Sequence, residues 1–135
     1  MDSKIKIACI IDDDEIYTFT VKRIIARAEI AEQSIFFDNG ASALDFFRAN
    51  AQKGEILPEL ILLDINMPQL NGWQFLEEYV KLAPSLAKKT SIFIVSSSID
   101  ADDYARAKKY REVSDFIAKP ITVENLRSIL AKLPN

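Results

Sequence analysis

The chain has 135 residues, the usual length of one domain, and 49% of them are apolar, which is enough to fill a core. Its net charge of −3, with lysine and arginine spread along the chain, argues against nucleic acid as a direct partner. No stretch approaches the roughly 20 apolar residues that cross a bilayer, and the first residues lack the apolar segment of a signal peptide. We therefore expect a cytoplasmic protein that does not contact a membrane.

Histidine is absent from the sequence, and Cys9 is its only cysteine. The lack of histidine excludes histidine metal sites, a Ser-His-Asp triad and an internal phosphohistidine relay. A single cysteine forms no disulfide within the chain, and its place in an apolar run predicts a position in the core.

Short apolar runs alternate with longer amphipathic segments along the whole chain. The runs have the length and composition of buried strands: Ile5–Ile11, Ser34–Phe37, Leu60–Leu63, Ile92–Val95 and Asp115–Ala118. The segments between and after them have the apolar spacing of helices: Glu15–Ala28, Ala41–Asn50, Trp73–Leu82, Ala101–Tyr110 and Val123–Leu133. In the first of these segments, the residues at helical spacing are Ile16, Phe19, Thr20, Ile24 and Ile25.

Several residues mark the ends of the expected helices. Asn39-Gly40 and Asn71-Gly72 punctuate two helix starts, and Pro84 ends a helix. Thr122 is a candidate N-cap for the last helix, and Ser98 for the helix after the fourth strand, because hydroxyl oxygens accept hydrogen bonds from the free N–H groups of a first turn.

Strand alternating with helix five times is the pattern of an α/β domain with a parallel sheet. The runs Ile5–Ile11 and Leu60–Leu63 are apolar on both faces, as expected when helices cover both sides of the sheet. In such folds ligands bind beyond the carboxyl ends of the strands. The residues that end the strands are therefore the candidates for a functional site.

Polar residues end four of the five expected strands. They are the acids Asp12, Asp13 and Asp14, then Asp64, then the serines 96 to 98, and finally Lys119 with Pro120. Clustered carboxylates repel one another, and a hard divalent cation such as Mg²⁺ relieves this repulsion. An aspartate can then act as a covalent phosphoryl acceptor, with positive charge and hydrogen-bond donors around the transferred oxygens. The set is chemically complete for receiving a phosphoryl group.

Four segments of the sequence, IIDDD, LLDINMPQLNGWQF, IVSSS and FIAKP, resemble the signature blocks of bacterial response-regulator receiver domains, the single-domain chemotaxis response regulator among them. The resemblance runs from about Lys4 to Leu133, and it implies one receiver domain over residues 1–135. It also implies a flavodoxin-like (βα)5 fold, a doubly wound parallel sheet of strand order 2-1-3-4-5.

The same resemblance implies roles for individual residues. Asp64 matches the phosphoacceptor, Asp13 the acid that binds Mg²⁺ directly, and Asp12 the acid that acts mostly through water. Asn66 matches the residue whose backbone carbonyl completes the metal site. Ser96 and Phe116 match the two switch positions, and Lys119 matches the lysine that pairs with the phosphoryl group. Pro120 matches a proline preceded by a cis peptide bond, and Asn66 and Ser98 occupy positions that tune hydrolysis of the phosphoaspartate.

In the mechanism that follows from the resemblance, a sensor histidine kinase or a histidine phosphotransfer protein donates the phosphoryl group to Asp64. Ser96 then moves inward, Phe116 rotates into the space vacated, and an unidentified target protein reads the surface formed by the fourth helix, fifth strand and fifth helix. The protein is expected to be a monomer or weak dimer that catalyses only its own phosphorylation and dephosphorylation. This sequence encodes no output domain after Leu133, and three possibilities stay open: a stand-alone regulator, a phosphorelay shuttle, or a receiver cut from a longer protein.

Each of these features also has a plain structural interpretation. The acids 12 to 14 suit a solvated loop with an N-cap, Asp64 suits a turn, the serines suit caps, Lys119 suits the surface and Phe116 suits the core. Two other functions remain open. One is a phosphorylation-independent interaction module on the same fold, and the other is an aspartyl-nucleophile phosphatase. The phosphatase is disfavoured because Asn66 stands where that class carries its acid.

Overall fold

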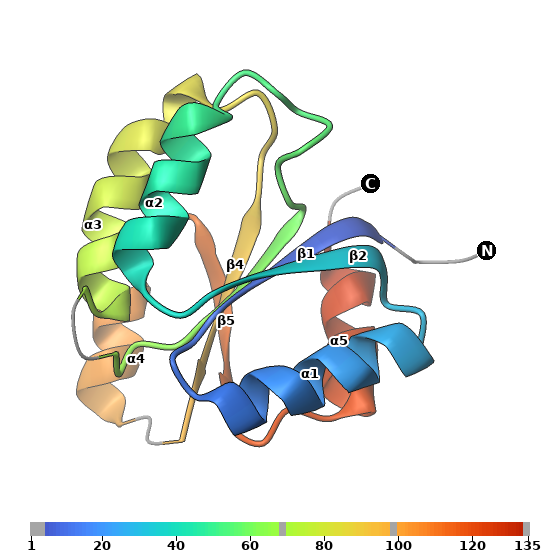
Figure 1. Cartoon of the computed structure of the whole chain (residues 1–135). Helices are drawn as coiled ribbons and strands as arrows, with labels where there is room; N and C mark the ends of the chain where they lie inside the picture. Colours follow the sequence, from blue (N-terminus) through green and yellow to red (C-terminus); the bar gives the residue numbers. More distant parts are fainter. Residues whose placement is uncertain (1–4, 68–69, 98–99, 134–135) are drawn as a thin grey trace.

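A computed structural model describes residues 5–67, 70–97 and 100–133. Its single sheet has five parallel strands in the order β2-β1-β3-β4-β5, which confirms the predicted flavodoxin-like topology (Figure 1). The strands are β1 (Ile5–Ile11), β2 (Ala31–Phe37), β3 (Leu60–Leu63), β4 (Ser91–Ser96) and β5 (Val113–Ala118). The helices are α1 (Glu15–Arg27), α2 (Gly40–Ala49), α3 (Gly72–Leu82), α4 (Ala101–Ala107) and α5 (Val123–Lys132), with a 3-10 turn η1 at Ala83–Ser85.

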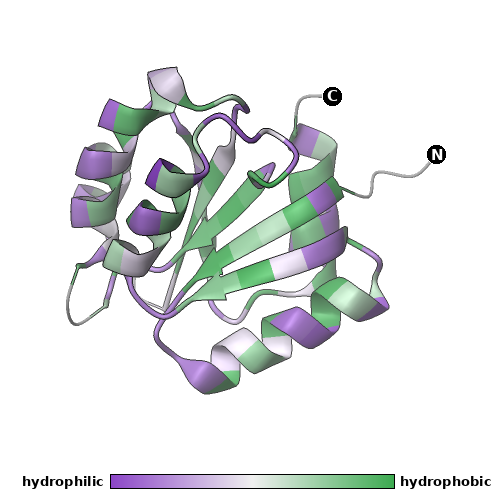
Figure 2. Cartoon of the chain, turned by 45° about the horizontal axis from the view of Figure 1, so that its top comes forward, coloured by the Kyte–Doolittle hydropathy of each residue, from purple (hydrophilic) through white to green (hydrophobic). Residues whose placement is uncertain are grey.

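Helices cover both faces of the sheet, with α2, α3 and α4 on one side and α1 and α5 on the other (Figure 1). Alternate residues of each strand therefore enter two separate cores. In β1, Cys9 and Ile11 join the core beneath α2, α3 and α4, whereas Ala8 and Ile10 join the core beneath α1 and α5. Figure 2 shows the apolar strands between helices that carry many hydrophilic residues. Cys9 is fully buried, as predicted.

The buried face of α1 matches the predicted spacing only in part: Ile25 is buried, and Ile24 packs against the same core. Ile16 and Phe19 are 80% and 60% exposed, whereas Val21 and Ile25 of the same helix are buried. The sheet accepts the face that contains Val21 and Ile25, because only that face meets the core formed with α5.

Most of the other differences between the predicted and the observed elements concern where a strand or helix begins or ends. β2 begins at Ala31, three residues before the predicted start. The sequence missed this start because Glu32 and Gln33 are exposed polar residues of an edge strand and lack the apolar pattern of a buried strand. β5 begins two residues early, at Val113, and α4 stops at Ala107 instead of Tyr110. Asp100, not Ser98, caps α4, and its carboxylate accepts the Asp103 N–H at 2.9 Å. Ser98 itself lies outside the described residues.

The other predicted helix ends are confirmed. Asn39, Asn71 and Thr122 are N-caps whose side chains accept backbone N–H groups of the first turns, and Pro84 lies in η1, directly after α3. Within the described ranges, no helix is long and apolar enough to cross a membrane.

Candidate functional site

The carboxyl ends of β1 and β3 bring three acids together. Ile11 of β1 is paired with Leu63 of β3, so the residues that follow them, Asp12 and Asp64, leave the sheet side by side. Each of Asp12, Asp13 and Asp64 offers a carboxylate oxygen within 4.8 Å of the other two. Asp12 and Asp64 are 4% and 5% exposed, whereas Asp13 faces solvent. The three acids form the acidic cluster, one side of which is open to solvent.

Local hydrogen bonds orient the acids. The Asp14 N–H donates to Asp12 Oδ1 at 2.9 Å, and the Asn66 N–H donates to Asp64 Oδ1 at 3.2 Å. Asp14 points the other way and caps α1, where its Oδ1 accepts the N–H groups of Ile16 and Tyr17 at 3.0 and 3.1 Å. Asp14 therefore starts the helix, as predicted, whereas Asp12 and Asp13 belong to the acidic cluster.

Lys119, directly after β5, reaches across to the acidic cluster. Its Nζ lies 2.9 Å from Asp12 Oδ2 and 3.8 Å from Asp64 Oδ2, and its side chain is 16% exposed. Its backbone N–H donates to the Ser96 carbonyl at 3.0 Å, which fixes the chain where the side chain departs. The Lys119–Pro120 peptide bond is cis, as predicted. This single ammonium offsets only part of the negative charge of the three acids, so the site as a whole is suited to a cation.

Ser96 ends β4 and is fully buried. The Asn66 side-chain amide lies at hydrogen-bonding distance from the Ser96 hydroxyl oxygen, with 3.4 Å between Nδ2 and Oγ. This contact links the loop that follows Asp64 to the end of β4. The structure thus places the two sequence-predicted residues in contact at the edge of the acidic cluster.

Phe116 is 9% exposed and belongs to the core beneath α2, α3 and α4. The ring of Tyr104, on α4, covers it with a centroid distance of 4.6 Å. Phe116 is two residues before Ala118, the strand partner of Ser96. Phe116 and Ala118 therefore lie on the same side of β5, and Phe116 is farther from the carboxyl end of the strand. The structure therefore places this residue in the core and not among the residues that touch the acids.

Burial raises the pKa values of the two inner acids, and neighbouring carboxylate charges add to the rise. Loss of hydration is the main cause for Asp64, and the neighbouring Asp12 charge adds to it, so the pKa of Asp64 rises from 3.8 to about 6. Burial also raises the pKa of Asp12, against the opposing effect of Lys119. Ionising Asp64 near neutral pH therefore costs free energy that a bound cation would recover.

This shift predicts how stability depends on pH. Because folding raises the pKa of Asp64, the folded protein binds more protons than the unfolded chain between about pH 4 and 6, and this group's contribution to the free energy of unfolding falls as pH rises through that window. We expect Asp64→Asn, without Mg²⁺, to be more stable than the wild type by about 1–3 kcal/mol above pH 6. In urea titrations, the free energies of unfolding of the wild type and Asp64→Asn should converge below pH 4. A difference that stays constant from pH 4 to above pH 6 would refute the raised pKa of Asp64.

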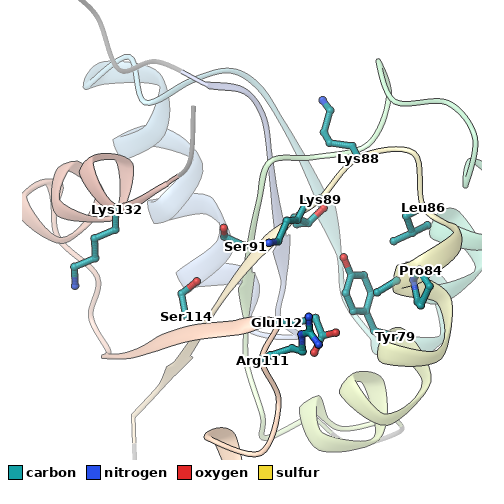
Figure 3. A pocket seen from close by; sticks show the side chains of 12 residues that line it. Tyr79, Pro84, Leu86, Lys88, Lys89, Ser91, Arg111, Glu112, Ser114 and Lys132 are labelled. Carbon is teal, nitrogen blue, oxygen red and sulfur yellow. The ribbon is translucent and has the colours of Figure 1, made fainter.

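Two clefts of similar size lie at opposite ends of the sheet. One, of about 650 Å³, runs from Asp12 and Asp13 along α1 to Asp38 and Ser42, and it gives a partner access to the acidic cluster. The other, of about 640 Å³, is bordered by Tyr79, Ser91 and Glu112 near the amino ends of β4 and β5 (Figure 3). The Lys88 and Lys132 side chains at its border point away from each other, and no acid of the cluster lines it.

One contact at the site involves a residue that the sequence motifs did not indicate. The ring of Tyr17, in the first turn of α1, lies 4.3 Å from the Lys119 Nζ. The motifs gave no signal for it, because a tyrosine in an amphipathic helix is ordinarily a core residue. The only sequence feature that places Tyr17 near the site is its position three residues after the helix cap Asp14.

Comparison with known proteins agrees with the fold. The model of the response regulator receiver domain family matches residues 8–131, so the chain belongs to that family and is a receiver domain of two-component signalling. A two-component response regulator from Cytophaga hutchinsonii has the same fold, with a TM-score of 0.86 and 29% identity over 96% of each chain.

Two curated relatives are similar over most of this chain. The probable methanogenesis regulatory protein FilR2 of Methanothrix harundinacea is 24% identical over 94% of this chain and 80% of its own length. The transcriptional regulatory protein HptR of Staphylococcus aureus is 29% identical over 92% of this chain. The chain spans only 44% of the length of HptR.

Proposed function

We propose that this receiver domain accepts a phosphoryl group on Asp64 from the phosphohistidine of a sensor histidine kinase or a histidine phosphotransfer protein. The observation that carries the proposal is the acidic cluster with Lys119 inserted in it, 2.9 Å from Asp12 and 3.8 Å from Asp64. Receiver domains are generally signalling modules and not enzymes acting on other substrates. We also propose that the domain works in the cytoplasm, as a monomer or weak dimer.

The transfer is a substitution at phosphorus. An ionised Asp64 oxygen attacks in line, and the P–O bond forms as the P–N bond to the donor imidazole breaks. The imidazole nitrogen keeps the electron pair of that bond and takes a proton from solvent. The Lys119 ammonium and the Ser96 hydroxyl stabilise charge on the equatorial oxygens. Lys119 is suited to this because it is already held beside Asp64, so little reorganisation is needed.

The donor set of the acidic cluster fits Mg²⁺. Mg²⁺ prefers oxygen ligands and is usually held by one or two carboxylates together with substrate phosphate, and three carboxylates offer oxygens within 4.8 Å of one another here. Asp13, Asp64 and the Asn66 backbone carbonyl would hold it directly, and Asp12 mostly through water. When bound, the ion supplies positive charge that offsets the acids and the phosphoryl oxygens.

The proposed output is a population shift at the surface formed by α4, β5 and α5. Phosphorylation adds a charge of about −2 and new acceptor oxygens, toward which Ser96 would move. In the structure, the ring of Phe116 is buried against Tyr104. Phosphorylation would favour this buried position over one in which Phe116 turns outward, and an unidentified target protein would read the difference.

The acceptor assignment is tested with acetyl phosphate and Mg²⁺. We expect the intact mass of the wild type to rise by one phosphoryl group, and Asp64→Asn to lose this modification by at least roughly 100-fold, because an amide has no nucleophilic oxygen at neutral pH. A matched control is Asp38→Asn, an acid that borders the same cleft outside the acidic cluster and should retain the modification. An unmodified wild type, or equal modification of Asp64→Asn, would overturn the proposal and favour the phosphorylation-independent interaction module.

A further inference from the structure

Tyr17 is held where a side chain can act on Lys119. Its backbone N–H donates to the Asp14 carboxylate at 3.1 Å, which fixes it in the first turn of α1 beside the acidic cluster. Its ring packs against the core beneath α1 and α5. The Lys119 Nζ lies 4.3 Å from the ring centroid, close enough for a cation–π interaction.

The surroundings of Lys119 make this contact stronger than an exposed one. The Lys119 side chain is only 16% exposed, so less water competes with the ring for its ammonium group. Asp12 holds the same ammonium from another direction at 2.9 Å. Lysine is a flexible side chain with a point charge, and it needs more than one fixed neighbour to hold one position.

The environment of the Tyr17 hydroxyl allows the role of the ring to be tested separately from that of the oxygen. This oxygen is buried and has no hydrogen-bond partner among the described residues. Burial raises the pKa of the phenol, and the charges of Asp12 and Asp64 add to this rise, which agrees with a hydroxyl on the side of the acids. Removing the hydroxyl therefore breaks no hydrogen bond within the described residues, whereas removing the ring breaks the contact with Lys119.

We propose that Tyr17 is a positioning residue for phosphoryl binding, and that the face of its ring holds the Lys119 ammonium in place between Asp12 and Asp64. This inference rests on the proposed function, because Lys119 is assigned there to the phosphoryl oxygens. Without the ring, Lys119 gains conformational freedom that must be lost again when a phosphoryl group binds. Tyr17 thereby acts through Lys119 and not by touching the reacting atoms.

The test compares Tyr17→Phe, which keeps the ring, with Tyr17→Leu, which does not. Beryllofluoride with Mg²⁺ is the probe, and its dissociation constant is measured by titration of each intact protein. We expect Tyr17→Leu to bind beryllofluoride roughly 3- to 30-fold more weakly and Tyr17→Phe to bind as the wild type does. Phe19→Leu is the matched control, since it removes a ring from the same helix that is 60% exposed and stacks on Arg23 instead.

Two further measurements separate positioning from a general loss of structure. In ¹³C-lysine NMR spectra, the ring current of Tyr17 should shift the ε-methylene signal of Lys119 in the wild type and in Tyr17→Phe, and this shift should vanish in Tyr17→Leu. In a Lys119→Met background, Tyr17→Leu should weaken beryllofluoride binding no further, because the residue through which it acts is gone.

The outcomes distinguish this inference from the proposed function. A wild type that neither binds beryllofluoride nor accepts phosphoryl from acetyl phosphate overturns the proposed function itself. If the wild type does both, equal affinity of Tyr17→Leu, equal loss in Tyr17→Phe, or an undiminished effect of Tyr17→Leu in the Lys119→Met background each overturns the role of the ring alone.

Discussion

Gly72→Ala is expected to lower the free energy of unfolding by about 3 kcal/mol, because the added carbon would overlap fixed backbone. A Cβ at Gly72 would lie 2.6 Å from the Ile65 Cα and 2.7 Å from the Asp64 carbonyl oxygen. Neither atom belongs to a flexible side chain, so the start of α3 or the loop after Asp64 must move. Urea unfolding of the two proteins measures the loss.

The same substitution should also slow modification of Asp64 by acetyl phosphate, because the displaced backbone is that of the proposed acceptor. Gly54→Ala is the matched control. Its Cβ would meet the nearest atom, Ala87 Cβ, at 3.8 Å, an ordinary contact distance, and its stability should stay within about 1 kcal/mol of the wild type. A Gly72→Ala protein with wild-type stability would show that the approach of α3 to this loop is looser than described.

Lys119→Met should affect both stability and activity. Removing the ammonium leaves Asp12 and Asp64 buried without their cation, which we expect to cost about 3 kcal/mol near neutral pH in the absence of Mg²⁺. The loss should shrink toward pH 4, where protonation neutralises the carboxylates. Modification by acetyl phosphate should fall on the order of 100-fold, because one of the groups facing the transferred oxygens is missing.

Lys88→Met separates these two effects. Lys88 forms an ion pair with Glu59 at 2.6 Å and is 23% exposed, but it lies outside the acidic cluster. The Lys88→Met variant should be less stable than the wild type, and acetyl phosphate should modify it at the wild-type rate. If Lys119→Met retains the wild-type rate while its stability falls, Lys119 is a structural counter-ion and not part of the phosphoryl site.

The sequence predicted an α/β domain with a parallel sheet because its central strands are buried on both faces, and the family resemblance implied the strand order. An apolar run as short as Leu60–Leu63 favours a strand over a helix, and the alternation with helices favours parallel pairing. Residues that end such strands meet at one edge of the sheet, so the sequence alone groups Asp12, Asp13, Asp64 and Lys119. This part of the prediction depends only on chain order and strand ends.

The sequence did not determine which side chains α1 buries. The set of residues at helical spacing includes Ile16 and Phe19, which are exposed, together with Ile25, which is buried, and it omits the buried Val21. The choice follows from contact with the sheet and α5, which local spacing does not encode. The cap of α4 was also misassigned, because Asp100 is as good a cap as the serine before it.

Sequence alone determined the order of strands and helices, the acids and the lysine at the strand ends, and the family signature that they form. Tertiary structure alone decided which atoms meet. Packing buries Asp12 and Asp64 and raises their pKa values, brings Lys119 closer to Asp12 than to Asp64, and lays the Tyr17 ring against that lysine. These contacts join residues that are far apart along the chain, and their strength depends on the loss of water around them, which exists only once the core has formed.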